Sequence, residues 1–161
     1  MINFNEQVFI IMQLKFKSSK KRMTIVCLHL KAFKEFEQKR LEQTKFMMDI
    51  LKEHLGVSGG DADCDLSNQA VLVCGDFNGA YFEQFYKVMI TDPLLKLKDA
   101  HEKFFNKSGM IRKSIDYVFY TNSTLKLARF LDLRIKEKWN DLPSLVYPSD
   151  HLSLVADFQF C

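Results

Sequence analysis

The stretch VLVCGDFNGA, residues 71–80, decides how this sequence is interpreted. Its first four residues are apolar and predict a buried strand. The strand runs directly into Gly75, Asp76, Phe77 and Asn78, so a carboxylate and a carboxamide follow at its end. Because an Asp after a strand is most often a turn or a helix cap, this pair alone leaves a structural and a functional interpretation open.

The segments around this strand predict a mixture of strands and helices. Residues 7–16 and 23–30 are rich in β-branched and aromatic residues and are separated by SSKKR, which predicts a hairpin. Apolar residues then recur every three or four positions up to Leu55, which predicts an amphipathic helix ending at Gly56. Further along we expect a helix over 81–90, paired strands over 114–120 and 124–133 around a turn at 121–123, and a last strand over 152–158. This pattern predicts an α/β or α+β class, a layered β-sandwich with flanking helices.

Composition limits the size and the class of the protein. With 161 residues and 47% hydrophobic content, residues 1–161 are expected to form a single unit. The formal charge of +3 is compatible with an anionic ligand, whereas a nucleic-acid arm has a far denser positive charge. The basic residues between 15 and 22 are expected to form a solvated hairpin tip.

The cysteines and the N-terminal segment bear on the compartment. There is no CxxC pair, and Cys27 and Cys74 lie inside apolar runs, which is typical of reduced core cysteines in a cytoplasmic or nuclear protein. The apolar run from Val8 to Met12 is too short for a signal peptide, and no run approaches membrane-spanning length.

Polar residues that could carry chemistry stand at the ends of several predicted strands. They are His29 in CLHLKA, Asp76 with Asn78 in GDFN, Asp116 in SIDYVFY, and Asp150 with His151 in PSDH. A carboxylate inside an apolar strand, such as Asp116, is costly unless a partner compensates it. Carboxylates bind Mg²⁺ or Mn²⁺ and activate water, and imidazoles stabilise phosphoryl oxygens, so together these types favour metal-assisted phosphate chemistry.

In these segments the sequence resembles the endonuclease/exonuclease/phosphatase family, and within it the branch of nocturnin and the carbon-catabolite-repressor deadenylases. The resemblance runs from about residue 7 to residue 160. It is carried by HLKA at 29–32, RLEQ at 40–43, VCGDFN at 73–78, SIDYVFY at 114–120 and LPSLVYPSDHLSLVADF at 142–158.

The resemblance implies catalytic roles for matching positions. Asp76 would orient or deprotonate the attacking water, and Asn78 would hydrogen-bond the scissile phosphate. His151 would stabilise the transition-state phosphate, with Asp116 accepting a hydrogen bond from it and fixing its orientation. Because polar groups at separated strand ends make sense if they share a ligand, we expect one pocket to be formed by Asp76, Asn78, Asp116, Asp150 and His151.

Binding roles follow from the same resemblance. Asp150 would lie at the metal centre, His29 would contact phosphate, and Lys31 would be a basic substrate-binding neighbour. Mg²⁺ is the implied cofactor, with Mn²⁺ as a substitute.

The sequence also departs from the family pattern. The family domain begins with a strand bearing an asparagine and a strand ending in a Gln-Glu pair, whose glutamate is the principal Mg²⁺ ligand. Neither is found, so the chain is expected to correspond to the second half of the domain.

Three functions stay open. The first is a 3′-exoribonuclease that shortens the poly(A) tail of mRNA. The second is a phosphatase that removes the 2′-phosphate of NADP(H), with Lys31 as a candidate contact. The third is an inactive fragment or binding module that lacks the metal-binding glutamate.

Overall fold

The computed structural model describes residues 2–4, 7–57, 66, 69–102, 115–131, 143–145 and 147–161. The elements in chain order are β1 (Ile2–Phe4), β2 (Gln7–Lys15), β3 (Arg22–His29), the 3-10 turn η1 (Lys34–Phe36), α1 (Glu37–Leu55), β4 (Gln69–Asp76), α2 (Gln84–Thr91), β5 (Leu97–Asp99), β6 (Asp116–Thr121), β7 (Leu125–Phe130) and β8 (Ala156–Phe160). Two short strands were not predicted, β1 and β5, and they form the two edges of the main sheet.

The centre of the molecule is a six-stranded mixed sheet in the order β1-β2-β3-β4-β6-β5. The predicted hairpin is confirmed, because β2 and β3 pair antiparallel with Phe9 opposite Leu28. β3 and β4 run parallel, which requires the long crossover that α1 provides. α1 ends where predicted, with Gly56 in the left-handed conformation at φ 74°.

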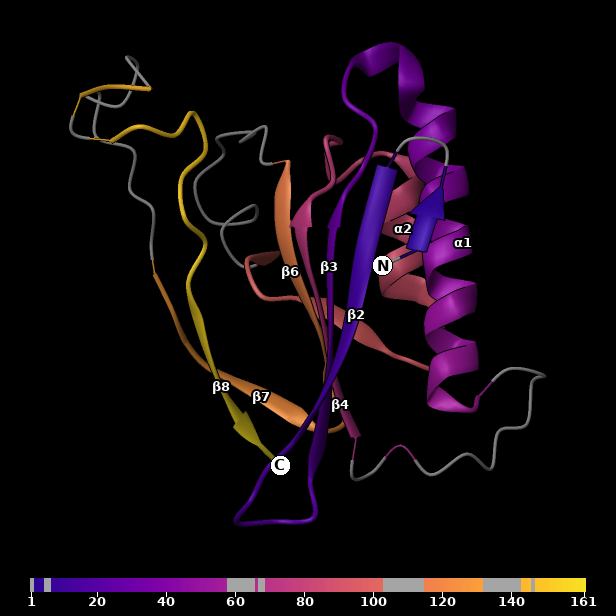
Figure 1. The fold of residues 1–161 in the computed structure, drawn as a ribbon, viewed down its shortest axis with the longest axis vertical. Coiled ribbons are helices and arrows are strands. Elements are labelled where there is room, and N and C mark those ends of the chain that lie inside the picture. The colour runs from indigo at the N-terminus through magenta and orange to yellow at the C-terminus, as the bar shows by residue number, and fades with distance from the viewer. Residues whose placement is uncertain are drawn as a thin grey trace.

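Both helices cover one face of this sheet (Figure 1). The main core lies between the helices and the sheet, where Met48 and Leu51 of α1 and Phe85 of α2 pack with Val26 and Val73 of the sheet. Alternate strand residues point to this side, so each strand contributes every second side chain to the core. None of the described helices is long and apolar enough to cross a membrane.

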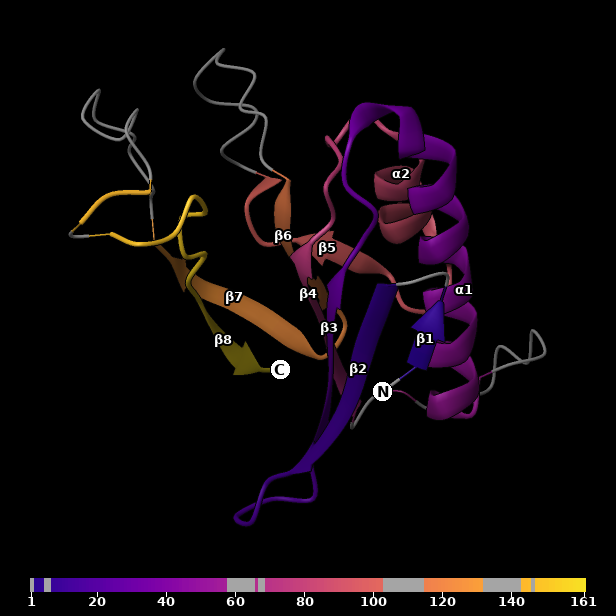
Figure 2. The same cartoon turned by 45° about the horizontal axis from the view of Figure 1, so that its top comes forward.

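The second layer is a two-stranded sheet of β7 and β8 on the opposite face (Figure 2). The prediction that the strands around 121–123 pair with each other was wrong, because β6 stays in the main sheet and β7 pairs with β8. The reason lies in packing: Leu125 is buried in a second cluster with Ala70 and Tyr120, which draws β7 over the sheet face. The layered α/β prediction itself is confirmed.

The two-stranded sheet covers this second face only in part. Along β2 a row of apolar side chains stays exposed, including Ile10 at 47%, Met12 at 48% and Leu14 at 39%. Cys27, predicted to be a core cysteine, is also exposed, because it points to this side of β3 and away from the helices. Cys74 beside it is half-buried, and burial together with the neighbouring Cys27 raises its pKa to about 11.

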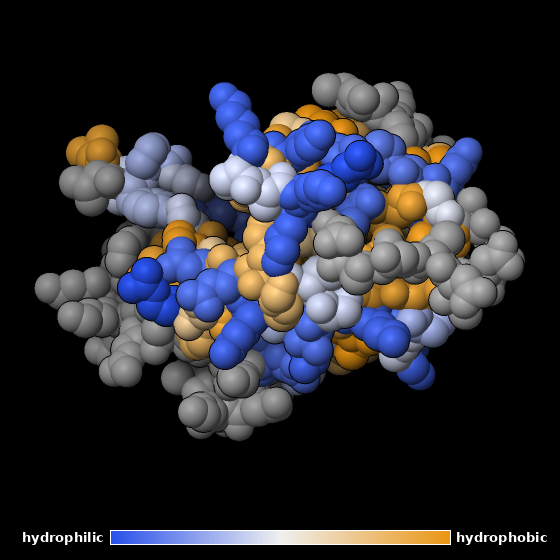
Figure 3. All heavy atoms as spheres, turned by 90° about the horizontal axis from the view of Figure 1, so that it is seen from below, coloured by the Kyte–Doolittle hydropathy of each residue, from blue (hydrophilic) through white to orange (hydrophobic). Residues whose placement is uncertain are grey.

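The basic tip of the β2–β3 hairpin is solvent-exposed over residues 17–20, as predicted. Lys21, the residue that follows this tip, contacts the last two residues of the sequence. Its Nζ donates a hydrogen bond to the carbonyl of Cys161 over 2.6 Å and lies 5.0 Å from the ring centre of Phe160. Seen from this end, the surface alternates between hydrophilic and apolar regions (Figure 3).

Candidate active site

Three neighbouring strands bring the predicted polar residues together at one end of the sheet. In register, His29 at the end of β3 is opposite Asp76 at the end of β4, and Asp76 is opposite Asp116 at the start of β6. Gly75 allows this close arrangement, because a Cβ at its position would lie 2.0 Å from the carbonyl oxygen of Leu28. The glycine of GDFN is therefore required by the approach of two strands.

The two carboxylate oxygens of Asp76 have different surroundings. Oδ1 accepts a hydrogen bond from the backbone N–H of Asn78 over 2.8 Å, which fixes the rotamer of the carboxylate. Oδ2 faces two imidazoles, with Nε2 of His29 at 3.6 Å and Nε2 of His151 at 3.7 Å. These separations are longer than a direct hydrogen bond but too short for an atom to fit between the groups, so a water or a phosphoryl oxygen would contact both groups from their solvent-exposed side.

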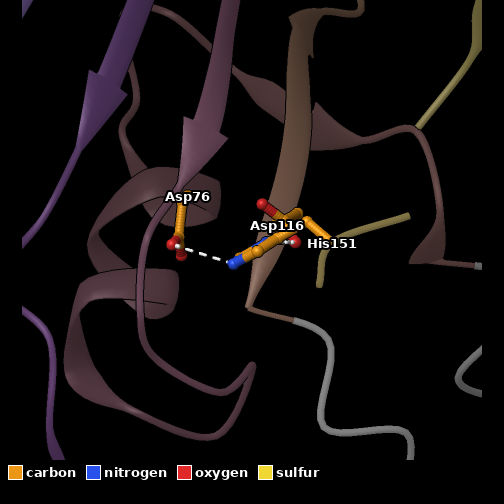
Figure 4. A group of neighbouring side chains, drawn as sticks. All are labelled: Asp76, Asp116 and His151. Atoms are coloured by element: carbon orange, nitrogen blue, oxygen red, sulfur yellow. Dashed lines mark hydrogen bonds and ion pairs between the residues drawn. The ribbon is translucent and has the colours of Figure 1, made fainter. Parts of the chain in front are cut away.

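Asp116 and His151 form the second part of the site. Nδ1 of His151 lies 2.8 Å from Oδ2 of Asp116, which is the expected hydrogen bond, and the opposite nitrogen points toward Asp76 (Figure 4). The hydrogen bond to Asp116 raises the pKa of His151. Burial raises the pKa of Asp116, and the hydrogen bond from His151 opposes that rise. The pair therefore favours the protonated imidazole, whose Nε2 points toward Asp76.

Asp76, Asp116 and His151 also form a group that could hold a metal ion. One ligand atom from each lies within 4.8 Å of the others, and all three residues are only partly buried, which leaves the group open to ligands. The two carboxylates are the hard oxygen donors that Mg²⁺ prefers, and Mn²⁺ accepts an imidazole nitrogen as well. The donor set thus fits a divalent cation that keeps several of its waters.

Other residues singled out in the sequence lie around this group. The amide nitrogen of Asn78 donates to the carbonyl of Leu30 over 3.0 Å, and the Asn78 backbone is left-handed at φ 51°. Asp150 is exposed and is not part of the three-residue group, although its charge helps raise the pKa of its neighbour His151. The ammonium of Lys31 lies 5.3 Å from the ring centre of Phe36.

A buried ion pair behind the site was not predicted. Arg40 is 1% exposed and forms two hydrogen bonds with the carboxylate of Glu83, at 2.9 and 3.0 Å. Its remaining nitrogen donates to the carbonyls of Lys31 and Phe33, so one guanidinium ties the loop after β3 to the loop after β4. The sequence held a signal for this, since Arg40 falls on the apolar stripe of α1 together with Thr44.

Phe33, whose carbonyl accepts a hydrogen bond from Arg40, carries an exposed aromatic side chain. Phe33 is 70% exposed and has a left-handed backbone at φ 74°, which is unfavourable for a residue other than glycine. Its carbonyl is held by Arg40 at 2.7 Å. Such local strain is retained where surrounding contacts fix the backbone, and it is found most often near functional sites.

Comparison with known proteins places this geometry in a family. No family model matches the chain. Nocturnin from Homo sapiens is 33% identical over 170 residues, covering 96% of this chain and 37% of that protein. The Ccr4 3′-5′-exoribonuclease subunit of the CCR4-Not complex from Candida albicans is 23% identical over 189 residues, covering 96% of this chain and 24% of that protein.

Solved structures agree with these relatives. The human nocturnin catalytic domain with bound sulfate superposes with a TM-score of 0.78 at 29% identity, covering 98% of this chain and 54% of that domain. The 2′,3′-cyclic phosphatase ANGEL2 shares the fold, with a TM-score of 0.71 at 17% identity and 95% of this chain covered. The chain thus spans little more than a third of the length of the mammalian nocturnins it matches. It belongs to the nocturnin and Ccr4 branch of the endonuclease/exonuclease/phosphatase family, of which it represents a partial domain.

Proposed function

We propose that this chain carries the water-activating half of a metal-dependent phosphoesterase that removes nucleotides from the 3′ end of poly(A) RNA. The observation that supports this most is that Nε2 of His151 faces Oδ2 of Asp76 at 3.7 Å, while Asp116 holds the other imidazole nitrogen at 2.8 Å. A carboxylate and an imidazole that face the same solvent-exposed position can orient a nucleophile and stabilise charge on phosphate.

The roles divide according to the contacts. Oδ1 of Asp76 accepts a hydrogen bond from the backbone N–H of Asn78. Its other oxygen, Oδ2, is therefore positioned to orient a water molecule or to accept a proton from it. His151, whose pKa Asp116 raises, donates to the phosphoryl oxygen on which negative charge accumulates. A divalent cation held at the carboxylates would further neutralise the phosphate.

The position of His29 fits a role in binding the substrate phosphate. Its side chain is 65% exposed and lies beside Asp76 at the rim of the group. Phe33, four residues further along, offers an exposed ring on which a base of single-stranded RNA can stack. These two residues would hold the phosphate and the base of a terminal nucleotide.

A second candidate function is removal of the 2′-phosphate of NADP(H). The observation that favours it is Lys31, a cation on the loop that begins at His29, fixed there by backbone hydrogen bonds to Gln43 and Arg40. A cation on a backbone held in this way suits a phosphomonoester, whose charge is greater than that of a phosphodiester.

The two reactions are distinguished with a hybrid protein in which this chain follows the N-terminal part of human nocturnin that it does not match. With Mg²⁺ or Mn²⁺, we expect the hybrid to shorten a poly(A) oligonucleotide and to lose this activity with a chelator. Release of phosphate from NADP(H) without shortening of poly(A) would favour the second function.

The 161-residue chain by itself is the matched comparison. Of the groups that the structure describes, Asp76, Asp116 and His151 lie close enough together to share one metal ion, and two carboxylates with an imidazole are a weak set for Mg²⁺. We therefore expect no turnover of either substrate by the chain alone. Metal-dependent hydrolysis by the chain, abolished by Asp76→Ala, would show that it needs no further ligand, while an inactive hybrid would favour the binding-module interpretation.

A further inference from the structure

The partly covered face of the main sheet carries two thiols side by side. Cys27 of β3 and Cys74 of β4 are register partners, and partners on adjacent strands point to the same side of a sheet. The Sγ of Cys74 lies 3.5 Å from the carbonyl oxygen of Val26, the residue before Cys27. Both are free cysteines.

The two thiols differ in their access to solvent. Cys27 is exposed, whereas Cys74 is half-buried and lines a groove of about 260 Å³ together with Asp116 and Leu152. An oxidant in solution therefore meets Cys27 first. Cys74 is then the adjacent thiol that can attack an oxidised Cys27, because the two residues are register partners on neighbouring strands.

The pair lies directly next to the candidate active site. His29 and Asp76, which are register partners two residues further along the same strands, point to the same face as Cys27 and Cys74. The two pairs form successive rows across β3 and β4. A covalent change in the thiol row therefore acts on the strands that hold the Oδ2 of Asp76 opposite the imidazoles.

We propose that Cys27 and Cys74 form a reversible dithiol–disulfide site that responds to peroxides. Hydrogen peroxide oxidises the Cys27 thiol to a sulfenic acid and is itself reduced to water. The Cys74 sulfur then attacks the sulfur of this sulfenic acid, and the hydroxyl group leaves as a second water when it takes the thiol proton. Two thiols and one peroxide thus give one disulfide and two waters.

The geometry predicts a bond that forms and is readily reduced. Neighbouring strands are about 4.8 Å apart, within the Cα separation that disulfides accept, but directly opposite Cβ atoms are farther apart than the roughly 3.8 Å that a relaxed disulfide favours. Strained disulfides are the labile ones. The bond is therefore expected to open again in excess reduced glutathione, and to shift the spacing of β3 and β4 beside Asp76.

The test uses the full chain with Cys64 and Cys161 replaced by Ser, so that only the proposed pair can react. After treatment with one equivalent of hydrogen peroxide, a non-reducing tryptic digest is analysed by mass spectrometry. The expected product is peptide 23–31 linked to the peptide that contains Cys74, with the loss of two hydrogens from the monomer. Excess reduced glutathione should return more than nine-tenths of it to the dithiol.

Two single variants serve as matched controls. Cys74→Ser should stop at the Cys27 sulfenic acid, trapped by dimedone, and Cys27→Ser should remain largely unmodified over the same time. The proposal is overturned if the two-cysteine chain gives only intermolecular dimers or stable Cys27 adducts, or if Cys74 reacts as fast when Cys27 is absent. Circular dichroism before oxidation establishes that each variant is folded.

Discussion

Replacing Arg40 with Met should remove the anchor behind the site and strongly destabilise the protein. Arg40 makes hydrogen bonds of 2.9 and 3.0 Å to Glu83, whose side chain is only 11% exposed, and bonds of 3.1 and 2.7 Å to the carbonyls of Lys31 and Phe33. Met fills most of the volume but leaves a buried carboxylate without its cation and two carbonyls without donors. Breaking a buried ion pair on one side costs about 3–5 kcal/mol, a large part of the roughly 5–15 kcal/mol that stabilises a domain.

Urea unfolding followed by far-UV circular dichroism measures this loss. With a slope of about 2 kcal/mol per molar urea, the midpoint should fall by roughly 2 M. Lys45→Met, at an exposed position of the same helix, is the control and should shift the midpoint little. The double variant Arg40→Met/Glu83→Gln should be more stable than Arg40→Met, because the unpaired charge is gone. Equal stability of Arg40→Met and Lys45→Met would refute the reasoning.

Three further predictions concern backbone and protonation. In thermal unfolding, Gly75→Ala should destabilise the protein more than Gly56→Ala. A Cβ at Gly75 would lie 2.0 Å from a carbonyl oxygen of β3, whereas Gly56, also at positive φ, has open space around it. Equal losses of stability in the two variants would contradict the close approach of the strands. Burial raises the pKa of Asp99 from 3.8 to about 6, so the native state keeps a proton that the unfolded chain loses and stability falls as pH rises through about 4 to 6. Asp99→Asn should remove this loss, worth about 2 kcal/mol at pH 7 relative to pH 4, as measured by urea unfolding at the two pH values. Asp116→Asn should lower the pKa of His151 toward its ordinary value, followed by NMR titration of the imidazole; an unchanged pKa would mean that the hydrogen bond does not form in solution.

Strand and helix identity could be predicted because local pattern determines them. The β-branched and aromatic content of residues 7–16 and 23–30 and the spacing of apolar residues in α1 each indicate one structure, and Gly56 indicates the helix end. The pairing of β7 could not be read in this way. A turn at 121–123 suits a hairpin, but the burial of Leu125 against Ala70, a contact far apart in sequence, directs the strand into the second layer.

The candidate site was predictable as a set of residues and not as a geometry. Polar groups at strand ends indicated Asp76, Asp116 and His151, and a charge in an apolar strand indicated that Asp116 has a partner. No sequence pattern states which oxygen of Asp76 faces an imidazole. That depends on the Asn78 backbone, whose N–H occupies the other oxygen.

The most direct test of the account is the rate at which the hybrid protein hydrolyses poly(A) with and without Asp76→Asn. The substitution keeps the size of the side chain and its acceptor for the Asn78 N–H, but removes the carboxylate that orients water. We expect single-turnover hydrolysis to fall by about two to four orders of magnitude, the range that positioned acid–base groups supply, while the affinity for a non-hydrolysable oligonucleotide changes less than about threefold. A rate within twofold of the unsubstituted hybrid would contradict the assignment of Asp76 to the reaction.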